Sequence, residues 1–273
     1  MLSLLKFERP FFTARCVAPT ATGSWSGKNH DHVLTLMGHF GIRKAFVPTV
    51  SAFSGRIATA SDLMEIIELD HGRQYRTCAT AVEGGEVAVG EALMVGAGGC
   101  PFIVAYDTIP GGVSRMIFAH AGRDSLIDRK RIDNGTPREH EGILYAIAAA
   151  FEDWGTPPNR VSIEAFFSID PEVFLHSFDI PGDEERAQAH RALYRDIRRR
   201  WGDAACYEAQ TPDGHPAAAI DQPQLILAQA QEIGFGFCRH QGLLPLAGPY
   251  PHTRHPVEAM RGKRNMIILH RTA

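Results

Sequence analysis

The feature that most constrains the fold is a pair of apolar runs in the middle of the chain, joined by a Pro-Gly-Gly turn. It reads GGCPFIVAYDTIPGGVSRMIFAHAG and covers residues 98–122. Two runs of this length around a turn predict a unit that resembles a β-hairpin. Cys100 heads the first run and His120 ends the second. Two ordinary buried strands need neither a thiol nor an imidazole, so both residues are candidates for function.

The remaining periodicity predicts helices mixed with strands. The expected helices cover residues 31–41, 141–155, 183–202 and 221–234, and glycines end them at 41, 155, 202 and 234. The expected strands cover residues 44–53, 73–99, 161–170 and 264–271, and residues 62–70 fit a helix or a strand. There is no regular βαβ alternation, so we expect a single α+β domain of mixed sheets and flanking helices over residues 1–273.

The composition excludes several classes of protein. The chain has 273 residues, 28 Lys and Arg against 31 Asp and Glu, and a net charge of -3, so no basic excess points to nucleic acid. Its apolar runs are shorter than the roughly 20 residues that span a bilayer. We also expect no signal peptide, because charges interrupt the apolar N-terminus. Five scattered cysteines then predict reduced thiols and a cytoplasmic location.

Three reactive residues share one local pattern. His71, Cys100 and His120 each lie beside a glycine at the edge of an apolar run, where the backbone permits a close approach by a ligand. One Cys and two His can bind zinc or copper and leave a fourth position open. They can equally form a nucleophilic thiolate with one His as base and the other as orienting group. Their wide spacing matches no local metal motif, so buried filler residues are the ordinary alternative.

Four short elements resemble, in order, elements of the laccase-domain family, which includes multicopper polyphenol oxidases, purine nucleoside phosphorylases and a peptidoglycan editing factor. The four elements are Asp70-His71-Gly72, Glu91-Ala92-Leu93-Met94, Gly99-Cys100-Pro101 and His120-Ala121-Gly122. Segments 161–174, 217–234 and 252–269 continue the likeness, so the resemblance spans about residues 60–273. It implies the fold shared by laccase-domain proteins and the cytotoxic necrotizing factors.

The resemblance also implies a function. A zinc or copper ion would be held by His71, Cys100 and His120, in an enzyme that cleaves a purine nucleoside with phosphate or deaminates adenosine. Arg123 and Arg254 would orient anionic or polar groups of this small-molecule substrate, and Asn29 would contact it. No nucleic-acid or membrane partner is expected.

The chain also departs from the family pattern. Gly99 replaces an Asp before the cysteine, and Arg123-Asp124-Ser125 replaces Trp-Arg-Gly after His-Ala-Gly. The Cys-Thr pair expected after segment 217–234 has no counterpart. Three alternatives therefore stay open. They are a metal-free cysteine hydrolase with Cys100 as nucleophile and His120 as base, a copper-dependent oxidase of a phenolic or specialised metabolite, and a non-catalytic divergent member.

Overall fold

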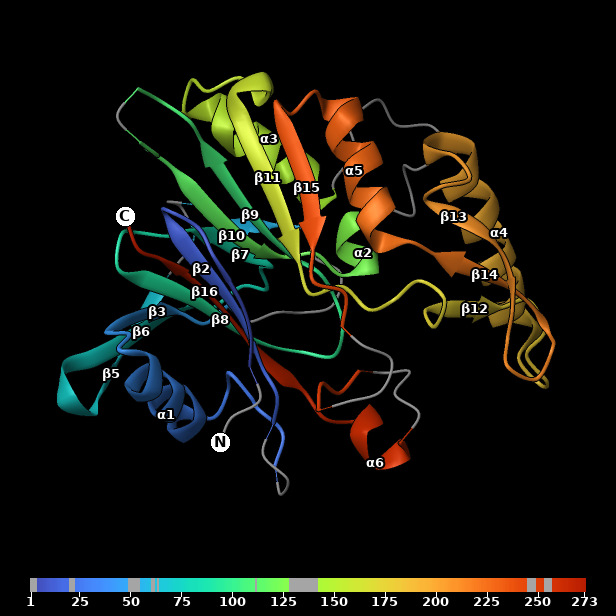
Figure 1. Cartoon of the computed structure of the whole chain (residues 1–273), viewed down its shortest axis with the longest axis horizontal. Coiled ribbons are helices and arrows are strands. Elements are labelled where there is room, and N and C mark those ends of the chain that lie inside the picture. The colour runs from blue at the N-terminus through green and yellow to red at the C-terminus, as the bar shows by residue number, and fades with distance from the viewer. Residues whose placement is uncertain are drawn as a thin grey trace.

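Two stacked β-sheets form the centre of the molecule, and helices cover their outer faces (Figure 1). The computed structural model describes residues 4–19, 23–48, 55–59, 62, 64–110, 112–127, 142–244, 249–252 and 257–273. The expected α+β class with mixed sheets and flanking helices is confirmed.

The first sheet has seven strands and runs through the middle of the chain and both of its ends. Its order is β1 (Leu4–Glu8), β2 (Phe12–Val17), β16 (Asn265–Arg271), β8 (Glu91–Ala97), β3 (Lys44–Phe46), β6 (Arg73–Cys78) and β5 (Met64–Leu69). The strands β3, β6 and β8 are parallel to one another, whereas β5 and β6 form an antiparallel hairpin at the edge.

The second sheet has six strands and contains the unit that dominates the sequence. Its order is β15 (Phe237–Gln241), β11 (Val161–Phe166), β9 (Phe102–Asp107), β10 (Met116–His120), β7 (Gly84–Glu86) and β4 (Ile57–Ala58). The predicted hairpin is therefore observed as β9 and β10, which pair antiparallel.

The apolar strand β9 shows how the layers are held together. Phe102 and Val104 belong to the core between the two sheets, whereas Ile103 and Ala105 belong to the core under the helices. Successive side chains of a strand point to opposite faces, so a strand covered on both sides is apolar throughout. A third core packs α1 (His30–Phe40) against the outer face of the seven-stranded sheet.

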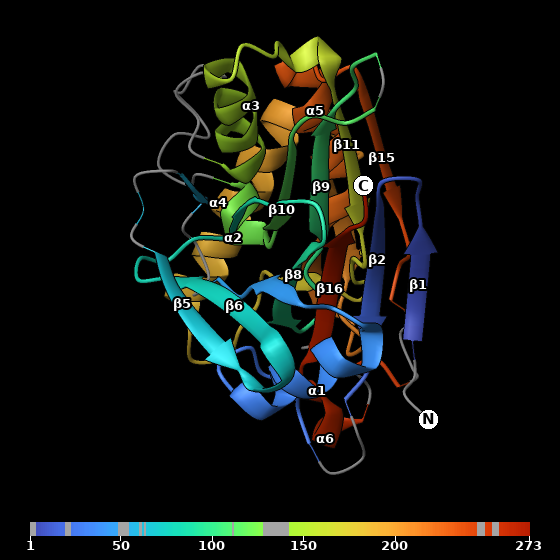
Figure 2. The same ribbon diagram turned by 90° about the vertical axis from the view of Figure 1, so that its left-hand side faces the viewer.

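The outer helices begin and end where local chemistry predicts. The second sheet is covered by α3 (Ile143–Asp153) and α5 (Gln222–Ile233), with the short α2 (Arg123–Leu126) beside them (Figure 2). Asp221 caps the first turn of α5 by accepting from the Gln224 N–H, and Gly234 ends it at φ 86°. Another short helix, α6 (Glu258–Arg261), precedes the last strand.

A smaller layer lies beyond the helices, at the right of Figure 1. The charged helix α4 (Glu184–Trp201) packs against a three-stranded sheet of β12 (Leu175–Ser177), β14 (Pro216–Ile220) and β13 (Cys206–Gln210). The strands β13 and β14 were not predicted from the sequence. Among the described helices, none is both long enough and apolar enough to cross a membrane.

Candidate functional site

The β9–β10 hairpin brings Cys100 and His120 together. His120 lies directly opposite Phe102, so the residues just before β9 lie beside the end of β10. The Ala121 N–H donates to the Pro101 carbonyl at 2.8 Å and closes this end of the hairpin. The Cys100 thiol is close enough to the imidazole of His120 to raise its pKa. A methyl group on Gly122 would lie 3.3 Å from His120 Nε2 and 3.4 Å from Cys100 Sγ, so both atoms border one small space.

A buried carboxylate completes the array from the neighbouring strand. Glu83 Oε2 lies 2.7 Å from His120 Nδ1, and the Glu83 carbonyl accepts from the His120 N–H at 2.8 Å. This pairing needs a close approach of β7 to β10, because a Cβ on Gly84 would lie 1.9 Å from the Phe118 carbonyl oxygen. Glu83 was not predicted as a site residue from the sequence. Its signal is an acid directly before the paired glycines that open a buried strand.

The array favours a charged imidazole. Burial alone would lower the pKa of His120, but Cys100 and Glu83, through charge and hydrogen bonds, raise it from 6.5 to about 10. Glu83 is fully buried and His120 is 8% exposed. A charged imidazole is therefore the state that these surroundings stabilise.

The shared space opens into a pocket of about 200 Å³. It is lined by Gly98, Gly99, Cys100, His120, Gly122, Arg123, Asp124, Ser125, Ile169, Phe174 and Gln222. Gly99 has a φ of 103°, and a Cβ there would lie 3.0 Å from His252 Cβ. A side chain at this position would be strained, which explains why this chain carries glycine where the family resemblance leads one to expect Asp.

Arg123 lies in the pocket wall, as expected for a substrate-binding residue. Its guanidinium donates to both oxygens of Asp124, at 3.0 and 2.7 Å, and its Nη1 lies 2.6 Å from His176 Nε2. These contacts fix the orientation of the guanidinium and partly neutralise its charge. Contact between Arg123 and a substrate stays a prediction.

His71 is not brought to the other two residues. It lies in the turn Asp70–Gly72 of the β5–β6 hairpin, where its φ of 62° and that of Gly72, 66°, form the reversal. The start of β6 is level with the start of β8, because Gln74 and Glu91 both pair with Lys44. Cys100 follows the far end of β8, whose seven residues span roughly 20 Å. In Figure 1 the hairpin lies at the left edge and α2, just after His120, lies right of centre.

The described residues do not fit the zinc or copper centre that the resemblance implies. A zinc site needs at least three protein ligands. Cys100 offers one sulfur and His120 offers only Nε2, because Nδ1 is engaged by Glu83. Within the described ranges, no three His, Cys, Asp or Glu side chains are grouped as metal ligands.

Of the two other predicted site residues, the structure describes only Asn29. Asn29 is the N-cap of α1, and its side-chain oxygen accepts from the N–H groups of Asp31 and His32 at 3.0 and 3.3 Å. It is exposed and does not line the pocket of Cys100. Arg254 lies outside the described residues.

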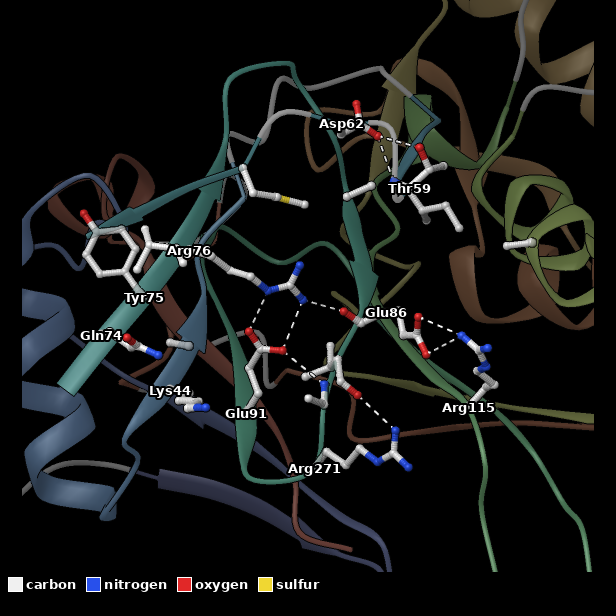
Figure 3. A pocket seen from close by; sticks show the side chains of 18 of the residues that line it. Lys44, Thr59, Asp62, Gln74, Tyr75, Arg76, Glu86, Glu91, Arg115 and Arg271 are labelled. Atoms are coloured by element: carbon white, nitrogen blue, oxygen red, sulfur yellow. Dashed lines mark hydrogen bonds and ion pairs between the residues drawn. The ribbon is translucent and has the colours of Figure 1, made fainter. Parts of the chain in front are cut away.

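A larger cavity, of about 1000 Å³, lies elsewhere between the two sheets (Figure 3). Four of the charged groups in its described lining form two ion pairs. Arg76 donates to both oxygens of Glu91 at 2.6 and 3.1 Å, and Arg115 to both oxygens of Glu86 at 3.0 and 3.1 Å. Its described lining includes no Cys or His. We therefore place the candidate active site in the smaller pocket, which carries the reactive groups.

Fold and site together define an α+β protein of two stacked sheets and covering helices, with a thiol–imidazole–carboxylate array in a small pocket. The same fold occurs in Neisseria meningitidis protein NMB0706, described as DUF152, with a TM-score of 0.58, 12% identity and 99% of each chain covered. It also occurs in the Bacillus licheniformis hypothetical protein YfiH (TM-score 0.56, 11% identity, 96% of this chain and 97% of the other). YlmD from Geobacillus stearothermophilus is a third such structure (TM-score 0.56, 13% identity, 98% of each chain).

These neighbours are laccase-domain proteins, so the resemblance seen in the sequence is confirmed at the level of the fold. No protein-family model and no curated protein matches the sequence.

Proposed function

We propose that the protein is a cysteine hydrolase that cleaves the carbon–nitrogen bond of a small amide. One observation carries the proposal: His120 lies between the Cys100 thiol and the buried Glu83 carboxylate, with Nδ1 and Oε2 2.7 Å apart. A nucleophile, a base and a group that orients the base are the parts that nucleophilic catalysis requires. Of the alternatives that the sequence left open, the geometry favours this one.

The chemistry follows from these three groups. The Cys100 thiolate attacks the amide carbonyl carbon and forms a C–S bond. As the C–N bond breaks, the Nε2–H of His120 protonates the departing nitrogen, and ammonia or an amine leaves. His120 then removes a proton from water, whose oxygen attacks the thioester carbon. The C–S bond breaks, a carboxylic acid leaves, and the Cys100 thiolate and the protonated His120 are regenerated. Glu83 holds Nδ1–H throughout, so that Nε2 always faces the sulfur.

The pocket supports a small substrate. Its volume of about 200 Å³ is below the roughly 300–1,000 Å³ of sites that enclose drug-sized ligands. Ile169 and Phe174 supply an apolar surface, whereas Arg123 and Gln222 supply polar groups. An acyl group with a short chain, or one amide-bearing side chain, matches this size and chemistry. Action on a purine nucleoside stays a prediction without a contact in the described residues to support it.

The test begins with the reactivity of the thiol. Iodoacetamide at pH 6.5 should alkylate Cys100 faster than Cys238, which is also half-buried and whose pKa burial raises to about 12. Incubation with short primary amides should release ammonia, and an acid quench should trap an acyl group on Cys100. Cys100→Ala should abolish both, and Cys238→Ala, the matched control, should leave both unchanged.

Three outcomes would overturn the proposal. One is alkylation of Cys100 no faster than that of Cys238. Another is amide turnover that a chelator removes and zinc or copper restores. The third is turnover of adenosine, with or without phosphate, in the absence of any amidase activity, which would favour the nucleoside reaction that the family resemblance implies.

A further inference from the structure

A buried amide without partners lies in the wall of the Cys100 pocket. Gln222 is 1% exposed, and neither its Nε2 nor its Oε1 has a hydrogen-bond partner in the described part of the chain. Buried polar groups are almost always paired, because an unpaired one loses its bonds to water without replacement. Both atoms are closed to solvent in the described structure, so a ligand in the pocket becomes their partner once the side chain turns toward it.

The support of Gln222 is rigid. It is the first residue of α5, whose start is held by the Asp221 cap, and Pro223 follows it. Two turns later Gln229 donates to the Leu126 carbonyl at 2.8 Å and so ties α5 to the end of α2. Arg123, Asp124 and Ser125 of α2 form the neighbouring wall of the pocket. The amide is thus mounted on a fixed frame, as a residue that selects a substrate requires.

We propose that Gln222 is the specificity residue of this pocket and that it recognises a primary carboxamide. The inference rests on the proposed function and names its substrate class. An amide side chain offers N–H donors and a carbonyl acceptor side by side. A carboxamide presents the complementary pair, so Nε2–H donates to the substrate carbonyl while Oε1 accepts from the substrate N–H. An ester leaves Oε1 unpaired, and a carboxylate repels it.

Two alkylating reagents test this without knowledge of the natural substrate. Iodoacetamide carries a carboxamide, whereas methyl iodoacetate keeps the carbonyl and has no N–H. The alkylation rates at Cys100 are measured by mass spectrometry, and their ratio is divided by the ratio for N-acetylcysteine. We expect wild type to favour iodoacetamide by about tenfold or more after this correction, since one hydrogen bond corresponds to about a factor of ten.

Gln222→Leu should return the corrected ratio to about one. The matched control is Gln224→Leu, because Gln224 is an exposed glutamine on the same helix and does not line the pocket. It should keep the wild-type ratio. Thermal unfolding adds a second measurement. Gln222→Leu removes two unpaired buried atoms, so its unfolding temperature should equal or exceed that of wild type.

The outcomes distinguish a failure of the inference about Gln222 from a failure of the proposed function. If Cys100 reacts fast but wild type and Gln222→Leu give the same corrected ratio, recognition by Gln222 is overturned and the cysteine hydrolase stands. If Gln222→Leu unfolds at a clearly lower temperature and slows both reagents equally, Gln222 is structural and the inference is overturned. If Cys100 of wild type reacts no faster than Cys238 with either reagent, the proposed function itself fails.

Discussion

His120 and Glu83 lie side by side on neighbouring strands, with Nδ1 and Oε2 2.7 Å apart and both side chains buried. The β7–β10 pairing brings them there, since Ala119 is opposite Gly84 and the His120 N–H donates to the carbonyl of Glu83, just before β7. The carboxylate holds the proton on Nδ1, which leaves Nε2 for the sulfur of Cys100. We therefore expect the reactivity of the thiol to depend on a residue that does not line the pocket.

Glu83→Gln should slow the alkylation of Cys100 by about 10- to 100-fold. The substitution keeps the shape of the side chain and removes its charge, and a hydrogen bond to a charged group is worth about 1.5–3 kcal/mol. The measurement is the rate of iodoacetamide labelling at pH 6.5. Glu86→Gln, three residues along the same segment, is the control and should leave the rate unchanged. Equal rates in all three proteins would contradict an orienting role for Glu83.

The stability of the protein should fall between neutral and alkaline pH because of His120. Its pKa in the folded chain is raised from 6.5 to about 10. The added stability is therefore fully present below about pH 6.5 and is lost as the pH rises through about 10. Glu83→Gln removes the carboxylate that helps to raise this pKa. Urea unfolding at pH 6.5 and 10 should show a loss about 1–3 kcal/mol larger in wild type than in Glu83→Gln. Equal losses would contradict the coupling.

Burial of His240 should make the stability of the protein fall at acid pH. Burial lowers the pKa of His240 to about 4, so the unfolded chain takes up a proton before the folded one does. The stability is present above about pH 6.5 and is lost as the pH falls through about 4. His240→Phe should reduce the loss of the free energy of unfolding between pH 7 and 4.5, measured by urea unfolding. The control is His71→Phe, at an exposed residue. An unchanged dependence of the free energy of unfolding on pH in His240→Phe would refute this role of His240.

Much of the fold could be predicted from periodicity and turn chemistry. The glycines at 41 and 234 end α1 and α5, and the two apolar runs around the Pro-Gly-Gly turn form β9 and β10. The juxtaposition of Cys100 and His120 follows from the same feature, because the two ends of an antiparallel pair meet. These elements were predictable since local sequence alone determines them.

The rest of the site depends on contacts that local sequence does not encode. His71 resembled a ligand because a glycine follows it, yet that glycine serves the left-handed turn of an edge hairpin. Glu83 and Gln222 reach the site through pairing of β7 with β10 and docking of α5 beside α2. Neither arrangement has a signature in the spacing of the chain. The two residues became visible only with the three-dimensional structure.

Arg76 and Glu91 should matter for stability and not for reactivity. Glu91 is nearly buried and accepts two bonds from Arg76 and one from the Ala88 N–H. Removal of one partner leaves a buried charge, so Arg76→Ala should lower the free energy of unfolding by about 3–5 kcal/mol. Glu8→Ala, which breaks the exposed pair with Lys6, should leave the free energy of unfolding nearly unchanged. The labelling rate of Cys100 should be unchanged in both, and a loss below 1 kcal/mol for Arg76→Ala would contradict a structural role.

Gly122→Ala should block the site while the chain still folds. The φ of Gly122 is -62° and its ψ is 162°, which alanine adopts without strain. The new methyl group would lie 2.9 Å from His120 Cε1 and 3.4 Å from Cys100 Sγ, so the imidazole must move away from the sulfur. We expect at least a tenfold slower alkylation of Cys100. Gly262→Ala is the control, because φ there is -87° and nothing lies within 4 Å of the added atom. A Gly122→Ala protein that keeps both its unfolding temperature and its labelling rate would show that the thiol and the imidazole do not share this space.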